Sequence, residues 1–204
     1  MTTQKASKLN INSIAKIAIL SAVSILLMMI SFPLPVAPSF YKLDLSEVAV
    51  VIGGFAMGPL AAVLIELCKI VLNFLYNGTI TAGIGEAANF LIGCALVVPA
   101  SIIYRKDPNS KSALKGLIVG TLTMVVVSDL LNYFVLLPAY VSIVHFPMEA
   151  ILAAVPDMMK PLVNSQFTLV LYCVTLFNLI KGICISIVTM LIEPHLDKLL
   201  RENH

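Results

Sequence analysis

Residues 169–192 form one apolar run, LVLYCVTLFNLIKGICISIVTMLI. A helix needs about 20 such residues to cross the hydrocarbon core of a bilayer, so this run predicts a membrane span. Asn178 and Lys181 interrupt it, although a charged side chain at the centre of a span costs about 2.5–3.5 kcal/mol on insertion scales. Their spacing places both on one helix face, which we expect to face the interior of a bundle.

The composition extends this prediction to the whole chain. Of 204 residues, 59% are hydrophobic and 12% are charged, whereas soluble domains carry about 25% charged residues. We therefore expect a polytopic membrane protein whose spans share one domain, residues 1–204. Residues 13–32 are expected to be an uncleaved first span, because FPLPVAP follows where a signal peptide would have a small-residue cleavage site. The net charge of +2 gives no reason to expect nucleic-acid binding.

The pattern of apolar runs predicts an all-α membrane protein with a bundle of six transmembrane helices. The second helix is too short to cross a bilayer unaided, and Asp44 with Glu47 resembles a capping box at its start. Most Lys and Arg residues between the spans, together with Lys5 and Lys8, fall on the side of both termini. The positive-inside rule therefore places both termini in the cytoplasm. The predicted helices are 13–32, 46–57, 59–76, 84–104, 113–137 and 163–192.

Two connections are expected on the outer face. Residues 32–47 are rich in proline and contain three aromatic residues. Residues 138–162 are apolar but lack a spanning length between their prolines, which favours a segment that lies on the surface or caps the bundle.

Polar side chains inside the predicted spans are the candidate functional residues, because such residues usually line a bundle interior or a cavity. Glu66 and Lys69 are spaced to pair on one helix face, which by itself would make them a structural pair. Asp129 is a candidate counter-charge for Lys181. The complete set is Glu66, Lys69, Glu86, Asn89, Asp129, Asn132, Asn178 and Lys181.

A glycine-rich loop, NGTITAGIG at 77–85, precedes the predicted helix 84–104. Its glycines would let the backbone approach a ligand closely. Glu86, directly after it, would suit the positive end of the helix dipole. Two roles are open for this loop, helix capping and ligand contact.

Ala15, Ala18 and Ala22 share one face of the first predicted helix. Ala18 and Ala22 form a small-xxx-small motif, which allows another helix to approach closely. This face predicts either packing within the bundle or docking onto a separate membrane partner.

Motifs for catalysis are absent from the sequence. It holds no GxxxxGK[ST] phosphate loop, no HExxH or GxSxG motif, and no Cys or His cluster with metal-ligand spacing. The four cysteines lie in apolar runs and predict small buried hydrophobic side chains. We expect neither an enzyme nor a metal site, and energy for uphill transport would come from a coupled ion or a partner.

Four ordered segments carry a resemblance to a known family. From about residue 11 to 192 the chain resembles the riboflavin-specific S components of energy-coupling factor (ECF) transporters. The resemblance implies a six-helix vitamin-binding subunit of the bacterial plasma membrane that docks through its alanine face onto a membrane T component with two cytoplasmic ATPases. The segments are FPLPVAPSFYKLDLSE (32–47), GGFAMGPLAAVLIELCK (53–69), GTITAGIGEAANFLIG (78–93) and FNLIKG (177–182).

The same resemblance implies a substrate site. A loop at 33–45 would cover riboflavin, and a loop at 79–86 would contact it. Riboflavin is then the transported ligand, and no cofactor is expected. The substrate-binding residues that the resemblance implies are Asn132, Asn178, Lys181, Thr79, Ala82, Gly85, Glu86, Phe40, Tyr41 and Leu43.

The chemistry of riboflavin fits these residue types. One edge of the flavin ring alternates carbonyl acceptors with an N–H donor, and an Asn side chain offers both a donor and an acceptor. Lys offers donors only, which suits a flavin carbonyl or a tail hydroxyl. Phe40, Tyr41 and Tyr133 are candidate aromatic walls.

Two alternatives are open from the residues alone. The chain could be an S component for another vitamin. It could also be an ion-coupled secondary transporter that uses Glu66, Asp129 and Lys181 as a proton relay.

Overall fold

The computed structural model describes residues 11–79 and 81–201, so Lys5 and Lys8 lie outside the described residues. Within this part of the chain, five helical segments are long and apolar enough to cross a membrane. Two of these segments are interrupted by short π-helical turns. The elements of the five segments are α1 (Ile11–Met29), α3 (Pro59–Asn77), α4 (Ile84–Lys106), α5 (Ser110–Leu131) with η1 (Asn132–Leu136) and α6 (Leu137–Ser142), and α8 (Gln166–Thr168) with η2 (Leu169–Val174) and α9 (Thr175–Arg201).

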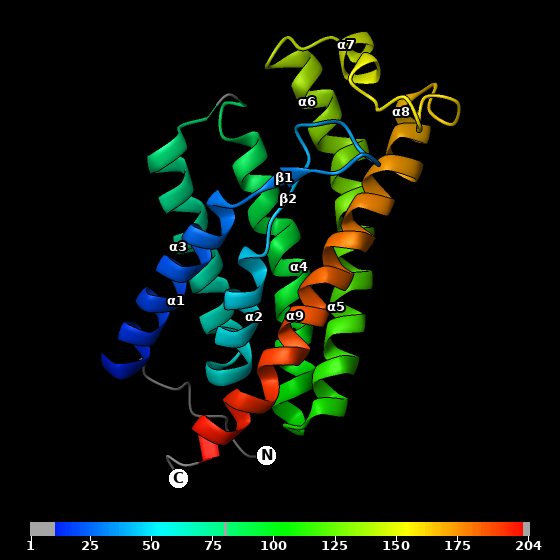
Figure 1. Ribbon diagram of the computed structural model, residues 1–204. Helices are drawn as coiled ribbons and strands as arrows, with labels where there is room; N and C mark the ends of the chain where they lie inside the picture. Colours follow the sequence, from blue (N-terminus) through cyan, green and yellow to red (C-terminus); the bar gives the residue numbers. More distant parts are fainter. Residues whose placement is uncertain (1–10, 80, 202–204) are drawn as a thin grey trace, which may run out of the picture.

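The second of the six predicted helices is present as α2 (Ser46–Met57), with the predicted bounds. Its 12 residues rise only about 18 Å at 1.5 Å per residue, so it falls short of the ~30 Å hydrocarbon core. A small antiparallel hairpin, β1 (Phe32–Pro33) and β2 (Lys42–Leu43), connects α1 to α2. The start of α2 therefore lies inside the bundle rather than at its surface (Figure 1).

The two ends of the bundle carry different elements (Figure 1). The start of α1, the end of α9 and the short α2–α3 and α4–α5 connections lie at one end, here called the terminal end. The α3–α4 connection, α6, α7 (Met148–Ala153) and α8 lie at the other, here called the hairpin end, toward which the hairpin loop also projects.

Small residues set the closeness of the helices. A Cβ on Gly116 of α5 would come within 2.7 Å of the Ala100 carbonyl oxygen of α4. A Cβ on Gly182 of α9 would likewise collide with Thr121 of α5. Glycine thus lets α5 pack tightly between α4 and α9, as small residues do in membrane bundles.

Several predicted boundaries differ from the structure. The first helix ends at Met29 instead of 32, since the chain then turns into the hairpin. The fifth predicted helix, 113–137, extends further in both directions, from Ser110 to Ser142. Asn109 caps its start by accepting from the Ser112 N–H at 2.9 Å, and the π turn at 132–136 carries it past the predicted end.

The predicted capping box at Asp44 and Glu47 is wrong. The residue at the N-cap of α2 is Leu45, and it makes no side-chain cap. Asp44 instead accepts from the Ser46 N–H and hydroxyl, and Glu47 binds Lys69 across the bundle. The Glu47 carboxylate is buried, and a buried charge needs an opposite charge as its partner, which Lys69 supplies.

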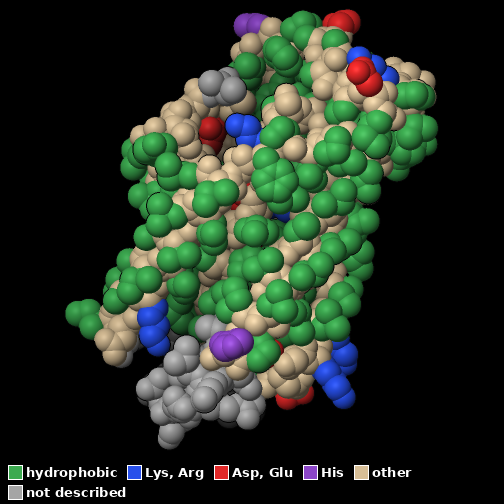
Figure 2. Space-filling model, in the orientation of Figure 1, with side chains coloured by type: hydrophobic (Ala, Val, Ile, Leu, Met, Phe, Trp, Pro, Cys, Tyr) green, Lys and Arg blue, Asp and Glu red, His purple; other side chains and the backbone are tan. Residues whose placement is uncertain are grey.

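The segment 138–162 caps the hairpin end, which was one of the two roles predicted for it. Ile151 of α7 is fully buried and belongs to an apolar cluster with Ala37 and Leu43 of the hairpin region and Leu169 of η2. A second apolar cluster holds α1 to α5 and α9 together nearer the terminal end. Outside these clusters, hydrophobic side chains cover the flank of the bundle, while charged ones gather toward its two ends (Figure 2).

Candidate functional site

Asn132 and Asn178 meet at one serine. The Asn178 side-chain amide donates to Ser128 Oγ at 2.8 Å, and the Asn132 amide donates to the Ser128 carbonyl oxygen at 2.9 Å and to its Oγ at 3.3 Å. All three residues are buried. The structure therefore brings together two residues that the sequence predicted and one that it did not.

Two π-helical turns flank this asparagine pair. Asn132 is the first residue of η1. The second turn, η2, leads directly into α9, which carries Asn178. A π turn widens the local helix and is found frequently at functional sites. Here it interrupts both spans at the same depth, since η1 and η2 contact each other. Sequence periodicity gave no sign of these turns.

The hairpin loop reaches this pair through Tyr41. The Tyr41 hydroxyl donates to Asn132 Oδ1 at 2.6 Å. Burial raises the pKa of the Tyr41 hydroxyl, and nearby Tyr140 adds to the effect, so the group stays a protonated donor. The Tyr41 ring lies 4.7 Å from that of Phe40 and 5.6 Å from that of Phe177, measured between centroids. Leu43 is buried beside them in the apolar cluster of the hairpin end.

Lys181 is buried and forms an ion pair with Asp44, with Nζ 3.0 Å from Oδ2. Burial alone would raise the pKa of the Asp44 carboxyl, but Lys181, Lys69 and two hydrogen bonds from Ser46 lower it to about 2. Asp44 is therefore ionised at neutral pH. The counter-charge of Lys181 is thus Asp44, from the end of the hairpin.

The prediction that Asp129 serves this role is wrong. Asp129 Oδ2 accepts from the Thr175 hydroxyl at 2.8 Å, one turn before Asn178. The ion pair of Lys181 is with Asp44 instead. Helical spacing could not show whether Asp44 or Asp129 pairs with Lys181. Asp44 lies in a loop, and the sequence does not specify the path of that loop into the bundle.

The α3–α4 loop forms its own polar group at the hairpin end. Glu86 accepts from the Thr79 and Thr81 hydroxyls, each at 3.1 Å. Gly85 lies beside Tyr140 of α6, since a Cβ there would be 3.4 Å from the tyrosine hydroxyl. Ala82 is exposed and adopts a positive φ of 53°. The N-cap residue of α4, Gly83, makes no side-chain cap, but the Thr81 hydroxyl accepts from the Gly85 N–H at 3.1 Å. Among the residues that the structure describes, no hydrogen bond or ion pair links this loop to Asn132, Asn178 or Lys181.

Two further candidates lie apart from the asparagine pair. The Tyr133 ring packs edge-on against Phe134 and Phe167, at 4.9 and 6.4 Å, on the partly exposed flank of η1. It does not form a wall with Phe40 and Tyr41. Asn89 is half-buried on α4.

The predicted pair of Glu66 and Lys69 is confirmed at 2.8 Å and includes a further acid. Lys69 Nζ also lies 2.7 Å from Glu47 Oε1 and 3.4 Å from the Ser46 hydroxyl. Ser46 in turn donates to Asp44. This polar network reaches Lys181 from α3 through the start of α2. The stretch KLDLSE was a usable sequence signal, since it sets two acids beside a helix that is otherwise apolar.

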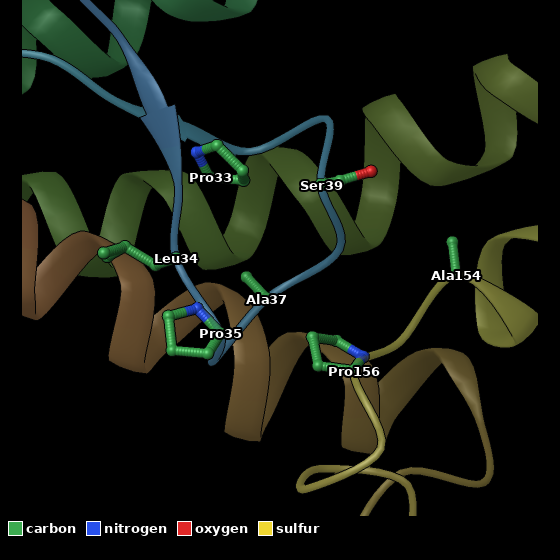
Figure 3. A pocket seen from close by; sticks show the side chains of 7 residues that line it. All are labelled: Pro33, Leu34, Pro35, Ala37, Ser39, Ala154 and Pro156. Carbon is green, nitrogen blue, oxygen red and sulfur yellow. The ribbon is translucent and has the colours of Figure 1, made fainter.

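An open hollow of about 320 Å³ lies at the hairpin end (Figure 3). The hairpin loop forms one side of it, and the segment after α7 forms the other. It is separate from the buried asparagine pair, which Tyr41 covers. A second hollow, of about 450 Å³, lies at the α4–α5 connection. The residues that line the first are Pro33, Leu34, Pro35, Ala37, Ser39, Ala154 and Pro156.

The alanine face of α1 is exposed along its length. Ala15, Ala18 and Ala22 all point away from the bundle, whereas Ser21 and Ser24 point into it. Packing within this chain therefore does not account for the small-residue motif.

Comparison with known proteins gives concordant matches. The family model of the substrate-specific component of ECF transporters matches residues 12–193. The chain is 36% identical over 185 residues to the riboflavin transporter RibU of Staphylococcus aureus (strain TCH60), covering 91% of this chain and 90% of that protein. It is 31% identical to the riboflavin transporter FmnP of Bacillus subtilis (strain 168), covering 90% and 91%.

A solved structure of the S component of a bacterial ECF transporter has the same fold. It superposes with a TM-score of 0.72 at 34% sequence identity, covering 93% of this chain and 97% of that one. The match extends over nearly all of both chains.

Proposed function

This chain belongs to the family of ECF transporter substrate-specific components, and on that premise we propose that it binds riboflavin and delivers it to an ATP-driven importer. The observation that carries the proposal is the meeting of Asn132 and Asn178 at Ser128, beneath Tyr41 of the hairpin loop. The riboflavin transporters among its relatives support the choice of ligand.

The flavin ring would replace the Tyr41 hydroxyl at Asn132. Asn132 Oδ1 accepts from Tyr41 here, so it can accept from the ring N–H once Tyr41 withdraws. The hydrogen bonds to Ser128 fix both amides in advance, which reduces the entropy lost on binding. Lys181 would donate to a flavin carbonyl or tail hydroxyl while Asp44 holds it in place.

The hairpin loop supplies the cover. Phe40, Tyr41 and Leu43 would enclose the ring with apolar surface, since Leu43 and Tyr41 already pack in the apolar cluster of the hairpin end. Entry of riboflavin then requires residues 33–45 to move away from Asn132. The loop at 79–86 would meet the ribityl tail through Thr79, Ala82, Gly85 and Glu86, whose hydroxyl and carboxylate groups match a polyhydroxyl chain.

The alanine face would dock onto the T component. Exposed Ala15, Ala18 and Ala22 allow a partner helix to approach the α1 backbone. Two cytoplasmic ATPases would then drive release. In this arrangement six helices cross the membrane, both termini are cytoplasmic and the hairpin end faces outward, with α2 and the hairpin together completing one crossing.

A titration of the purified protein with riboflavin tests the proposal. We expect saturable quenching of flavin fluorescence at submicromolar ligand, and no competition from thiamine or biotin. Absence of quenching at micromolar riboflavin would refute flavin binding, and competition by another vitamin would assign a different ligand. Uptake that needs the T component and ATP, and resists uncouplers, would separate the importer from an ion-coupled transporter.

A further inference from the structure

Five charged side chains are buried together between α2, α3 and α9. We call Asp44, Glu47, Glu66, Lys69 and Lys181 the buried charge cluster. It contains three carboxyl groups but only two ammonium groups. Fully ionised, it would hold one uncompensated negative charge inside the bundle.

The ion pairs show where that excess lies. Lys181 pairs with Asp44 at 3.0 Å. Lys69 donates to Glu47 Oε1 at 2.7 Å and to the Ser46 hydroxyl at 3.4 Å. Lys69 Nζ is also 2.8 Å from Glu66 Oε2, but this contact lacks hydrogen-bond geometry. Asp44 and Glu47 therefore each have a donor, and Glu66 does not.

Glu66 has the least favourable surroundings for a carboxylate. Its exposed fraction is 0%, and neither of its oxygens has a hydrogen-bond partner within the described residues. The carboxyl group packs on the backbone of α4, where a Cβ on Gly93 would come within 2.7 Å of the carboxyl carbon. The same Cβ would lie 3.2 Å from Glu47 Oε1, so the Glu47 and Glu66 carboxyl groups meet at Gly93, and Glu47 Oε2 is likewise without a hydrogen-bond partner.

The other groups around Glu66 do not offset a negative charge. From α4 comes Gly93, which has no side chain. From α1 comes Ser24, whose hydroxyl donates to the Ser46 carbonyl oxygen at 2.9 Å. Within the described residues, no three His, Cys, Asp or Glu side chains are grouped to hold a metal ion. An excess charge buried away from water is strongly unfavourable, and a carboxyl group in that position usually neutralises by protonation.

We propose that Glu66 is a proton-binding site: it is held as the neutral carboxylic acid and donates a hydrogen bond to the Glu47 carboxylate. One proton then gives one oxygen of each acid a hydrogen-bond partner, and the buried charge cluster carries no net charge. The ion pair of Glu47 with Lys69 thereby fixes the start of α2 to α3 without excess charge in the membrane interior. The start of α2 in turn positions Asp44, which pairs with Lys181.

Infrared spectroscopy of the purified, ligand-free protein at neutral pH tests this site. We expect the wild type to show the carbonyl stretch of a protonated carboxylic acid and Glu66→Gln to lack it. Glu47→Gln should also lack it, because Glu66 must then ionise to balance Lys69. The control Glu149→Gln, which alters an exposed acid of α7, should keep the band.

Thermal unfolding of the same proteins provides an independent readout. Glu66→Gln mimics the neutral acid, so its Tm should stay within about 3 °C of the wild type, a change of about 1 kcal/mol. The double variant Glu47→Gln/Glu66→Gln leaves Lys69 without a carboxylate, and we expect its Tm to fall by about 10 °C or more.

Three results would overturn the proposal. The first is a wild-type spectrum in which Glu66→Gln removes no acid band. The second is a Glu66→Gln protein that fails to fold or loses as much Tm as the double variant. The third is a Tm that rises in sodium chloride over choline chloride for the wild type alone, since that would assign a bound cation.

Discussion

Tyr41 and Asn132 join the hairpin loop to the π turn at the end of α5 through a 2.6 Å hydrogen bond. Asn132 is 1% exposed, so the bond is shielded from water. The residue that covers the proposed ligand site thus occupies the acceptor that a ligand would use. Tyr41 is therefore both a wall of the site and a competitor for it.

Tyr41→Phe should accelerate riboflavin association. The variant keeps the ring and removes the competing hydroxyl, and a net hydrogen bond is worth about 1 kcal/mol, or roughly fivefold in rate. Stopped-flow quenching of flavin fluorescence measures the association rate. Tyr76→Phe, at an exposed position of α3, is the control and should match the wild type. Slower association in Tyr41→Phe would show that the hydroxyl helps binding instead.

Asn178→Ala should weaken riboflavin binding by about 10- to 100-fold. It removes one hydrogen bond to the ligand and releases Ser128, at about 1.5–3 kcal/mol together. Equilibrium fluorescence titration measures the change in Kd. Asn73→Ala replaces an asparagine of α3 that bonds to Asn77, and it should leave the Kd unchanged. An equal loss in both variants would indicate a general effect on the fold.

Lys181→Met should destabilise the protein as well as weaken ligand binding. It leaves the Asp44 carboxylate buried without its ammonium partner, which costs about 3–5 kcal/mol. Adding Asp44→Asn removes the stranded charge, so the double variant should regain much of the Tm but not the affinity. Recovery of both would mean that Lys181 acts on the ligand only through the fold.

Riboflavin affinity should be flat between pH 5 and pH 8. The folded-state pKa of Asp44 is about 2, below its ordinary value of 3.8. A lowered carboxyl pKa contributes stability that is complete above the ordinary value and is lost only as the pH falls toward 2. Titrations at pH 5 and pH 8 should therefore agree within about twofold, which is ~0.4 kcal/mol. A marked loss at pH 5 would mean that Asp44 titrates in the working range.

The sequence predicted which residues make up the candidate site better than it predicted their partners in space. The spacing of Asn178 and Lys181 on one face was correct because helical periodicity fixes it. The partner of Lys181 was missed, since Asp44 enters the bundle on a loop and no periodicity governs a loop. Ser128 was missed for another reason. A serine in an apolar helix usually bonds to its own backbone, so nothing marked it as the bridge between two asparagines.

Helix boundaries were predicted from the sequence more accurately than the π turns. Bounds for α2 and α3 were predicted almost to the residue, because Gly58 and Pro59 separate them by turn chemistry. The turns at 132–136 and 169–174 add a residue to a helical turn without changing composition. Each π turn changes the direction in which the side chains of its span point, and this affects Asn132 and Asn178. The contact between α5 and η2 shows the change, but the sequence does not.

Ala18→Trp should abolish uptake while sparing riboflavin binding. Ala18 is exposed on the face of α1 that lies away from the bundle, so a large side chain there blocks a partner helix and leaves the asparagine pair untouched. Leu122→Trp is the matched control, because Leu122 is 57% exposed on α5, on the opposite side of the bundle from α1 (Figure 1), and should retain uptake. The measurements are flavin quenching by the purified subunit and uptake into vesicles with the T component and ATPases. Loss of quenching in Ala18→Trp would place α1 in the ligand site, and retained uptake would move the docking surface elsewhere.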